Sequence, residues 1–207
     1  MAVIREAAVA EAGEIRRVHA RSWLATYPNE DYGVTRQWVE EFTESWLTVQ
    51  ALAQSAEFIA QVIAAPDTFY RVAEVGGRIA GFVHAAKRGP DDAEILGLYL
   101  DPPVIGVGVG RQLMDAAIGW VGPAAARLDV APYNQRAIAF YRRYGFAEVP
   151  GSARLLNVLP WTTPDGRADA PAGLAVGVNA IPAITMARDR AGSAGLPATM
   201  AAGLGGR

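Results

Sequence analysis

The segment LYLDPPVIGVGVGRQLM, residues 98–114, carries the strongest local pattern in the chain. A β-prone run ends just before it, glycines follow at positions 106, 108 and 110, and a helical pattern extends from about Gly108 to Val121. Because glycine has no Cβ, the backbone N–H groups of such a loop can converge on an anion. The first turn of the helix adds unpaired N–H groups and the positive end of its dipole. The segment therefore predicts a diphosphate-binding loop, with Arg111 as an additional positive charge.

Two other nucleotide-binding patterns fit this loop less well. The dinucleotide fingerprint G-x-G-x-x-G requires a third glycine where this sequence has Arg111, counted from Gly106, or Leu113, counted from Gly108. Asp129 does follow at roughly the fingerprint's acidic position, about 20 residues on, so a dinucleotide-binding oxidoreductase stays an alternative. The phosphate-binding loop of ATPases ends in Gly-Lys-Ser or Gly-Lys-Thr, and the loop lacks that ending.

The elements around the loop predict a mixed sheet of the α/β (α+β) class. A short strand at 3–7 precedes helical stretches at 10–27 and 35–65, and two β-prone runs, 68–75 and 78–86, are joined by Gly76-Gly77, which is typical of a hairpin turn. A third β-prone run covers 93–100. After the loop and its helix we expect a strand at 127–130, a helix at 134–144 and a last strand at 181–187. Strands that form a meander and then alternate with helices are typical of a mixed sheet.

A second motif, NQRAIAFYRRYGF, occupies residues 134–146. Together with the glycine loop it resembles the two acetyl-CoA-binding motifs of the GCN5-related N-acetyltransferase (GNAT) superfamily, the second of which has the form N-x-x-A-x-x-F-Y-x-x-x-G-F. The motifs stand in the family's order and at its usual separation, and the resemblance covers about residues 4–146. One departure is Ile105, at a position where the family usually has Arg or Gln. The resemblance implies the GNAT fold, a mixed sheet splayed between its fourth and fifth strands, with helices on both faces.

The resemblance also implies acetyl-CoA as cosubstrate and N-acetyl transfer to a primary amine of a small molecule or peptide. The fourth strand, through Leu98, Tyr99 and Leu100, would pair with the pantetheine arm like an added strand. Asn134 would contact the pantetheine or the amine-binding region, and Tyr141 would lie beside the thioester sulfur. The diphosphate would be held by Gly106, Val107, Gly108, Val109, Gly110 and Arg111.

Tyr141 is the expected general acid, because a hydroxyl near the sulfur can protonate the departing thiolate. A helical face of Ala137, Phe140, Tyr141 and Tyr144 gives the alternative that Tyr141 is a core residue. Asn134 likewise suits the N-cap of the helix that carries Tyr141.

The general base is expected to be a carboxylate, since the attacking amine must lose its proton. Glu94 on the fourth strand and Asp129 on the fifth stand where different members of the family carry one. Each residue can equally be an ordinary charged residue of a strand end. His84, acting through water, is a third option, although a lone histidine is more often structural.

The acceptor amine is expected to meet the segment RSWLATYPNEDY, residues 21–32. In the family the first helices and the loop between them recognise the amine. Trp23, Tyr27 and Tyr32 would wall the pocket, and Glu30 and Asp31 would attract a cation. Ordinary aromatic packing at these positions is an equal alternative, and the acceptor itself is not identified by the sequence.

Composition narrows the remaining classes of function. The chain of 207 residues has no cysteine, two histidines far apart in sequence and a formal net charge of −2. We therefore expect no metal centre, no nucleic-acid partner and no membrane association, and a cytoplasmic protein without a secretory signal. The departure at Ile105 leaves a non-catalytic acyl-CoA-binding sensor as a further alternative.

The sequence marks the domain boundaries less sharply than it marks the two motifs. One acetyltransferase domain is expected at 1–190, with an inserted loop at about 150–180 that is rich in Pro, Gly and Ala and contains Trp161. Such an insertion can form a lid over the acceptor opening or a dimer contact, and a loosely packed excursion is the alternative. The chain is expected to be a monomer or a homodimer. Residues 191–207 are expected to form a flexible tail.

Overall fold

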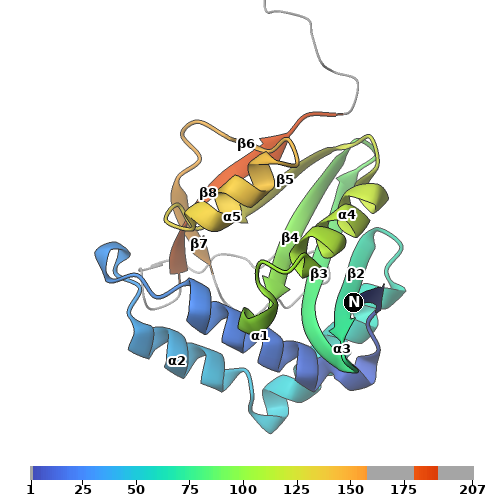
Figure 1. The fold of residues 1–207 in the computed structure, drawn as a ribbon, viewed down its shortest axis with the longest axis vertical. Helices are drawn as coiled ribbons and strands as arrows, with labels where there is room; N and C mark the ends of the chain where they lie inside the picture. The colour runs from blue at the N-terminus through green and yellow to red at the C-terminus, as the bar shows by residue number, and fades with distance from the viewer. Residues whose placement is uncertain (1, 158–179, 191–207) are drawn as a thin grey trace, which may run out of the picture.

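The computed structural model describes residues 2–157 and 180–190, and its eight strands form one mixed sheet (Figure 1). The order of the strands is β1-β2-β3-β4-β5-β8-β6, and β7 pairs with β8 outside this path. The strands are β1 (Val3–Glu6), β2 (Thr68–Val75), β3 (Arg78–Gly89), β4 (Asp92–Leu100), β5 (Ala125–Val130), β6 (Ala147–Glu148), β7 (Arg154–Asn157) and β8 (Ala180–Arg188). Of the pairings, β4 with β5 is parallel and the others are antiparallel. The predicted mixed sheet is confirmed.

The helices agree with the sequence pattern, with one subdivision. They are α1 (Ala12–Thr26), α2 (Arg36–Ser45), α3 (Val49–Ala64), α4 (Val109–Val121) and α5 (Gln135–Arg142), with short 3-10 turns at Val9–Glu11, Glu30–Tyr32 and Pro102–Val104. The stretch predicted as helical at 35–65 is two helices. Each begins at a threonine N-cap, Thr35 or Thr48, whose hydroxyl accepts a hydrogen bond from the backbone N–H three residues further on. Helix α2 ends at Ser45, and Thr48 then caps the start of α3.

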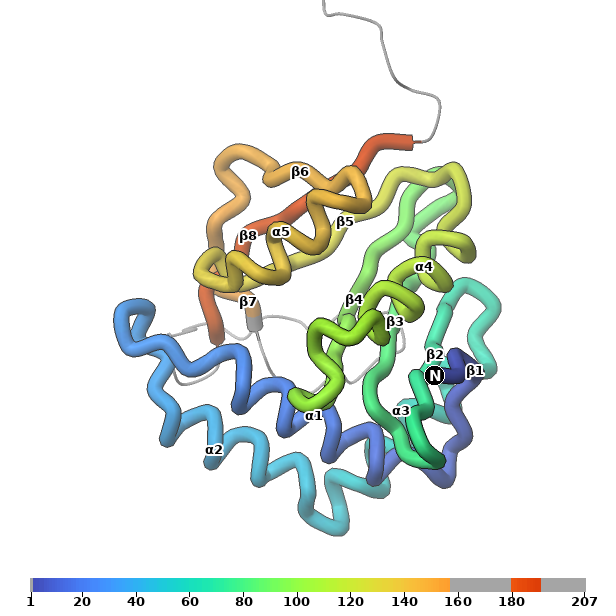
Figure 2. The backbone as a smooth tube through the Cα atoms, viewed as in Figure 1, coloured from blue at the N-terminus to red at the C-terminus, as the bar shows by residue number. Residues whose placement is uncertain are grey.

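Strands β4 and β5 part after a short parallel ladder. Four residue pairs, from Asp92 with Ala125 to Ile95 with Leu128, join the two strands. Beyond Ile95, β4 continues along β3 as far as Leu100, whereas β5 continues along β8. The tube view shows the two strands diverging toward α1 (Figure 2). The sheet is therefore splayed between its fourth and fifth strands, as the resemblance implied.

Helices cover both faces of the sheet, and alternate strand residues point to opposite layers of the core. Ala73, Val83 and Ala85 pack with Leu113 and Met114 beneath α4 and α5. On the other face, Val72 and Phe82 belong to a second cluster with residues of α1 and α3. A third, aromatic cluster joins α1, α2 and the start of β8. The sheet is thus the middle layer of three.

Gly81 and Gly110 allow α4 to approach the end of β4 closely. A Cβ on Gly81 would lie 2.6 Å from Cδ2 of Leu100 and 2.8 Å from the carbonyl oxygen of Tyr99. A Cβ on Gly110 would lie 3.0 Å from Cδ1 of the same leucine. The Leu100 side chain therefore occupies space that two missing Cβ atoms provide, and it packs the start of α4 against the sheet.

The segment after β6 contains one strand, β7, that the sequence did not indicate. Strand β6 follows Phe146, and β7, at Arg154–Asn157, pairs with the start of β8. The loop predicted at about 150–180 therefore begins with a strand. Trp161 and the rest of 158–179 lie outside the described residues, as does the tail predicted at 191–207. No helix of the described residues is long and apolar enough to cross a membrane.

Replacing Gly81 with alanine is expected to lower the free energy of unfolding by about 1–3 kcal/mol, because the new methyl group meets backbone as well as Leu100. Gly119→Ala is the matched control. Gly119 lies in α4, and a Cβ added there would have nothing within 4 Å, so alanine should stabilise by about 0.5–1 kcal/mol. Urea unfolding of both variants measures the difference, and equal effects would contradict the close packing at Gly81.

Candidate active site

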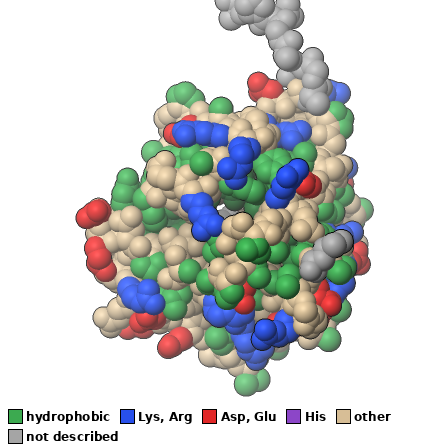
Figure 3. Space-filling model, viewed as in Figure 1, with side chains coloured by type: hydrophobic (Ala, Val, Ile, Leu, Met, Phe, Trp, Pro, Cys, Tyr) green, Lys and Arg blue, Asp and Glu red, His purple; other side chains and the backbone are tan. Residues whose placement is uncertain are grey.

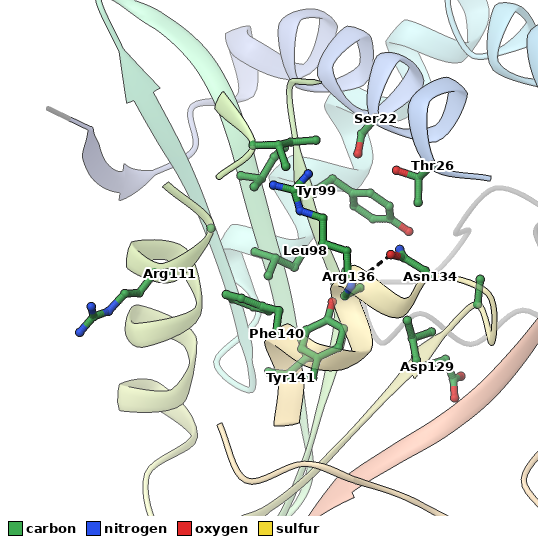
Figure 4. A pocket seen from close by; sticks show the side chains of 18 of the residues that line it. Ser22, Thr26, Leu98, Tyr99, Arg111, Asp129, Asn134, Arg136, Phe140 and Tyr141 are labelled. Atoms are coloured by element: carbon green, nitrogen blue, oxygen red, sulfur yellow. Dashed lines mark hydrogen bonds between the residues drawn. The ribbon is translucent and has the colours of Figure 1, made fainter. Parts of the chain in front are cut away.

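The gap between β4 and β5 opens into a cavity of about 330 Å³ (Figure 4). Its walls come from α1, the outer half of β4, the glycine loop, the start of α4, the end of β5 and the length of α5. The lining includes Ser22, Thr26, Tyr27, Leu98, Tyr99, Leu100, Ile105, Gly106, Gly108, Gly110, Arg111, Asp129, Asn134, Arg136, Phe140, Tyr141 and Arg143. A space-filling view of this face shows Lys and Arg side chains around a hollow near its middle (Figure 3). The cavity is therefore open on a basic face of the protein.

The glycine loop and α4 meet as the sequence predicts. Gly106 and Gly108 have φ angles of 92° and 94°, in the left-handed region that glycine adopts without strain. Gly108 is also the N-cap of α4, so the unpaired N–H groups of the first turn face the same side as the loop. Val107 and Val109 contribute backbone only, since the Val107 side chain is 71% exposed and that of Val109 is buried in the core. This arrangement suits an anion held by main-chain donors.

Arg111 differs from its predicted role as a charged supplement to the loop. Although it belongs to the cavity lining, its side chain points away from the cavity (Figure 4). Its guanidinium lies 3.6 Å from the Asp115 carboxylate one turn further along α4. The helix register therefore directs this side chain outward.

The outer half of β4 has one free edge. Leu98 and Leu100 pair with Val83 and Gly81 of β3, and on the opposite side the ladder with β5 stops at Ile95. Within the described residues no strand takes this place. Such an edge can pair with an extended ligand through main-chain hydrogen bonds.

Tyr141 belongs to both the core and the cavity, so its two sequence interpretations are compatible. It is 9% exposed, packs with the cluster beneath α4 and α5, and directs its hydroxyl into the cavity (Figure 4). Burial, and secondarily the nearby Tyr99, raises the pKa of Tyr141 well above its ordinary value. The hydroxyl is therefore protonated, and able to donate, at neutral pH. Asn134 caps α5 as predicted, accepting a hydrogen bond of 3.1 Å from the backbone N–H of Ala137.

The two predicted bases are both engaged in ion pairs. Glu94 does not line the cavity, and its Oε2 accepts a hydrogen bond of 2.7 Å from Nε of Arg88. Asp129 does line the cavity, but its carboxylate accepts hydrogen bonds from Arg154 at 2.5 Å and from the Thr185 hydroxyl at 2.9 Å. In Figure 4 this carboxylate points away from Tyr141. Both carboxylates therefore have hydrogen-bond partners, and of the two only Asp129 belongs to the lining.

His84, the third candidate for a base, lies outside the cavity. It is fully buried in the core and contacts the rings of Phe58 and Tyr70. Its buried position supports a structural role for this histidine.

One of the three aromatic residues predicted at the acceptor pocket reaches the cavity. Tyr27 lines it, whereas Trp23 is buried against Trp46 and Phe42. Tyr32 is 43% exposed and packs on the ring of Tyr133 at 4.8 Å. Alternation of aromatic residues in a linear segment does not show which of them face a cavity, because that depends on the rotation of α1.

The hydroxyl of Tyr99, on β4, forms hydrogen bonds with Tyr27 and Trp23 at the end of α1. Burial raises the pKa of Tyr99 above its ordinary value, although hydrogen bonds with Tyr27 and Trp23 act in the opposite direction. The hydroxyl of Tyr133 donates a hydrogen bond of 2.9 Å to the carbonyl of Tyr27. The end of α1 is thus fixed to both β4 and the segment that precedes α5.

A bidentate ion pair joins α1 to the glycine loop. Nε and Nη2 of Arg21 each lie 2.8 Å from a different oxygen of the carboxylate of Asp101, the residue that follows β4. Parallel hydrogen bonds of this kind fix orientation as well as distance. The pair therefore sets the position of the loop relative to the acceptor side.

Four polar residues of the lining were not predicted as site residues from the sequence: Ser22, Thr26, Arg136 and Arg143. Ser22 and Thr26 are separated by four residues, so they lie on one face of α1, directed toward the cavity (Figure 4). Helical spacing groups these two hydroxyls, but it does not indicate which face of α1 meets the sheet. Arg136 and Arg143 lie inside the second motif, at positions that its pattern leaves unspecified.

Comparison with known proteins gives the family. The model of the acetyltransferase (GNAT) family matches residues 15–146, which include α1, the glycine loop and α5. The chain belongs to the acetyltransferase (GNAT) family. Acetyltransferases of this family use acetyl-CoA, and the cavity combines the glycine loop, the splayed strand and Tyr141 where the family motifs predict them. Family membership and the mixed sheet leave the dinucleotide-binding oxidoreductase without support.

Individual relatives agree with this assignment. N-alpha-acetyltransferase RimI of Mycobacterium tuberculosis is 30% identical over 90 residues, which cover 42% of this chain and 57% of that protein. The match thus spans little more than half of that relative's length. Among solved structures, PaiA N-acetyltransferase of Thermoplasma acidophilum, crystallised in complex with coenzyme A, has a TM-score of 0.64 at 18% identity over 91% of this chain and 99% of that one. Ard1 of Thermoplasma volcanium has a TM-score of 0.55 at 24% identity over 90% and 96%. These two structures share the fold.

The residues described contain no group of three or more His, Asp or Glu side chains arranged to hold a metal ion.

Gly108→Ala is expected to lower the affinity for acetyl-CoA by at least about tenfold, because a side chain at a φ of 94° strains the loop by about 1–2 kcal/mol and moves its N–H groups. Isothermal titration calorimetry measures the affinity. Val107→Ala is the control, since this side chain is exposed and its loss should leave binding unchanged. Equal affinities for the two variants would show that loop geometry does not govern binding.

Proposed function

We propose that this protein transfers the acetyl group of acetyl-CoA to a primary amine by direct attack of the amine on the thioester. The observation that carries the proposal is the cavity itself, in which the free edge of β4, the glycine loop and the Tyr141 hydroxyl face one space. Each of these three features suits a different part of acetyl-CoA.

The cofactor would lie along the gap between the strands. Main-chain N–H groups of the loop and the first turn of α4 suit the diphosphate. The free edge of β4 at Leu98–Leu100 suits the amide groups of the pantetheine arm. An arm held in this way brings its thioester toward Tyr141 on the opposite wall, and this positioning supplies part of the rate enhancement.

In the reaction the amine nitrogen bonds to the thioester carbonyl carbon, the carbon–sulfur bond breaks, and the sulfur leaves as a thiolate. A main-chain N–H at the free edge of β4 is oriented in advance and can stabilise the oxyanion that develops on the carbonyl. The Tyr141 hydroxyl can donate to the departing sulfur, since its raised pKa keeps it protonated. The proton that the amine loses passes to solvent, and solvent returns one to Tyr141, so the products are the acetylated amine and coenzyme A as its thiol.

The acceptor that best suits this cavity is an α-amine, such as the N-terminus of a peptide. Both candidate carboxylate bases are paired with arginines, so the described lining offers no free carboxylate to deprotonate the amine. At pH 7 roughly one in ten α-amino groups is neutral, against about one in 2,500 lysine side chains. The name of the relative RimI, an N-alpha-acetyltransferase, points to the same class of amine. A small-molecule amine with a similarly low pKa satisfies the same argument.

A non-catalytic acyl-CoA-binding sensor is the second candidate function. Ile105 favours this candidate, because the first position of the loop is apolar here, whereas the family usually has Arg or Gln there. The two candidates share cofactor binding and differ in turnover.

We also propose that the acetyltransferase domain extends over 1–190 and that the protein works in the cytoplasm as a monomer or homodimer. The family model supports the domain through its match to 15–146, and β8 extends the sheet as far as Arg188.

Tyr141→Phe is expected to lower kcat by about 10²- to 10⁴-fold with little change in the affinity for acetyl-CoA, because phenylalanine keeps the packing and removes the proton donor. Thiol release with a panel of peptide and small-molecule amines measures kcat. Tyr144→Phe is the control. Its hydroxyl binds Asp115 on the outer side of α4, so kcat should be unaffected. No turnover by the wild-type protein with any amine, despite binding of acetyl-CoA, would favour the sensor.

The pH dependence of kcat/KM for the acceptor distinguishes the classes of amine. With no carboxylate base, the rate should follow the neutral fraction of the amine and level off near pH 8 for a peptide N-terminus. A lysine side chain would give a rate that rises to about pH 10. Peptides with a free N-terminus, compared with the same peptides blocked there but carrying lysine, provide the test. A preference for the lysine peptide at pH 7 would contradict the proposed acceptor.

A further inference from the structure

Arg136 extends from α5 across the mouth of the cavity to the glycine loop (Figure 4). Its Nη2 lies 3.1 Å from the position that a Cβ on Gly106 would occupy, so the guanidinium rests directly against the loop backbone. The two residues come from opposite sides of the gap between β4 and β5. A Cβ at this position would be in tight contact with the guanidinium, and the φ of 92° at Gly106 independently favours glycine there.

The guanidinium of Arg136 is exposed and forms no hydrogen bond or ion pair with the described residues. Three other arginines of this part of the protein are each paired with a carboxylate. Arg21 is paired with Asp101, Arg142 with Glu148 and Arg154 with Asp129. A positive charge that faces a cavity without a carboxylate partner is available to a ligand.

The glycine loop itself presents no cationic side chain to the cavity. Its first position is the apolar Ile105, and Arg111 is directed outward toward Asp115. Neutral N–H groups donate hydrogen bonds to a diphosphate but do not neutralise its negative charge. Arginine is suited to this task, because its planar guanidinium donates two parallel hydrogen bonds to phosphate oxygens and stays charged at any physiological pH.

We propose that Arg136 is a cofactor-binding residue that contacts the diphosphate of coenzyme A and supplies the charge that the loop lacks. This inference rests on the proposed function. The bound diphosphate lies between the loop amides on one side and the Arg136 guanidinium on the other. The cofactor is thereby held from both sides of the gap, by the loop before α4 and by Arg136 of α5.

Arg143 is the other arginine of the lining without an ion pair among the described residues, and it is placed differently. It follows Arg136 by two helical turns, and its guanidinium lies 5.6 Å from the centre of the Phe140 ring. It is absent from the neighbours of Gly106. Contact with the loop is therefore specific to Arg136.

The test compares coenzyme A with dephospho-coenzyme A, which keeps the diphosphate and lacks the 3′-phosphate. Calorimetric titrations are made with the wild-type protein, Arg136→Met, Arg136→Lys and the control Arg142→Ala, an exposed residue of the same helix outside the cavity lining. Methionine keeps length without charge, so Arg136→Met should weaken binding of both ligands by the same factor, about 10- to 100-fold. Arg136→Lys should recover part of the loss, and Arg142→Ala should bind as the wild type does.

Three results would overturn the inference. Wild-type affinity in Arg136→Met shows that the charge is not used. A loss seen with coenzyme A but absent with dephospho-coenzyme A assigns Arg136 to the 3′-phosphate. A loss of equal size in Arg136→Lys and Arg136→Met, unchanged between about 50 mM and 500 mM salt, indicates an effect of shape rather than of charge. Failure of the wild-type protein to bind either ligand would instead contradict the proposed function.

Discussion

The parting of β4 from β5 is the constraint on which the site depends. A parallel pair of strands normally satisfies its main-chain groups along its whole length. Here the ladder ends at Ile95 and Leu128, and each strand continues with a different partner. Polar main-chain groups left without a strand partner favour a ligand that supplies the missing hydrogen bonds. The main-chain groups along the gap therefore favour a bound ligand independently of the side chains around them.

Side chains keep this gap at a defined width. Leu100, in the space provided by Gly81 and Gly110, fixes α4 and its loop to the outer half of β4. Arg21 and Asp101 join the loop to α1, and Tyr133 joins α1 to the segment before α5. Each of the three walls is thus attached to the next by a contact between residues far apart in sequence. These contacts hold α4, the loop, α1 and the segment before α5 in place around the cavity.

The fold could be predicted from the sequence to the extent that local patterns determine it. The hairpin at Gly76-Gly77, the glycine loop before α4 and the cap at Asn134 each depend on the conformational preference of a few adjacent residues. Strand β7 could not be found in this way, because Arg154–Asn157 is a strand through its pairing with β8, which lies beyond the 158–179 segment. The same distinction applies to the site. Tyr141 was predicted because a motif fixes its spacing, whereas the pairing of Asp129 with Arg154 and Thr185 joins three strands and was not. Trp23 was expected at the cavity and lies elsewhere, because the rotation of α1 places Ser22 and Thr26 there instead. Tyr32, in the turn after α1, packs against Tyr133.

The glycine loop has one further consequence, which concerns regulation. Its ligand-facing groups are main-chain amides, which neither titrate near neutral pH nor accept a phosphoryl group. The wall formed by α1 and the residue after it differs, since Ser22, Thr26 and Tyr27 bring hydroxyl groups to it. Phosphorylation of a described lining residue would therefore change a side-chain hydroxyl and leave the main-chain amides of the loop unaltered.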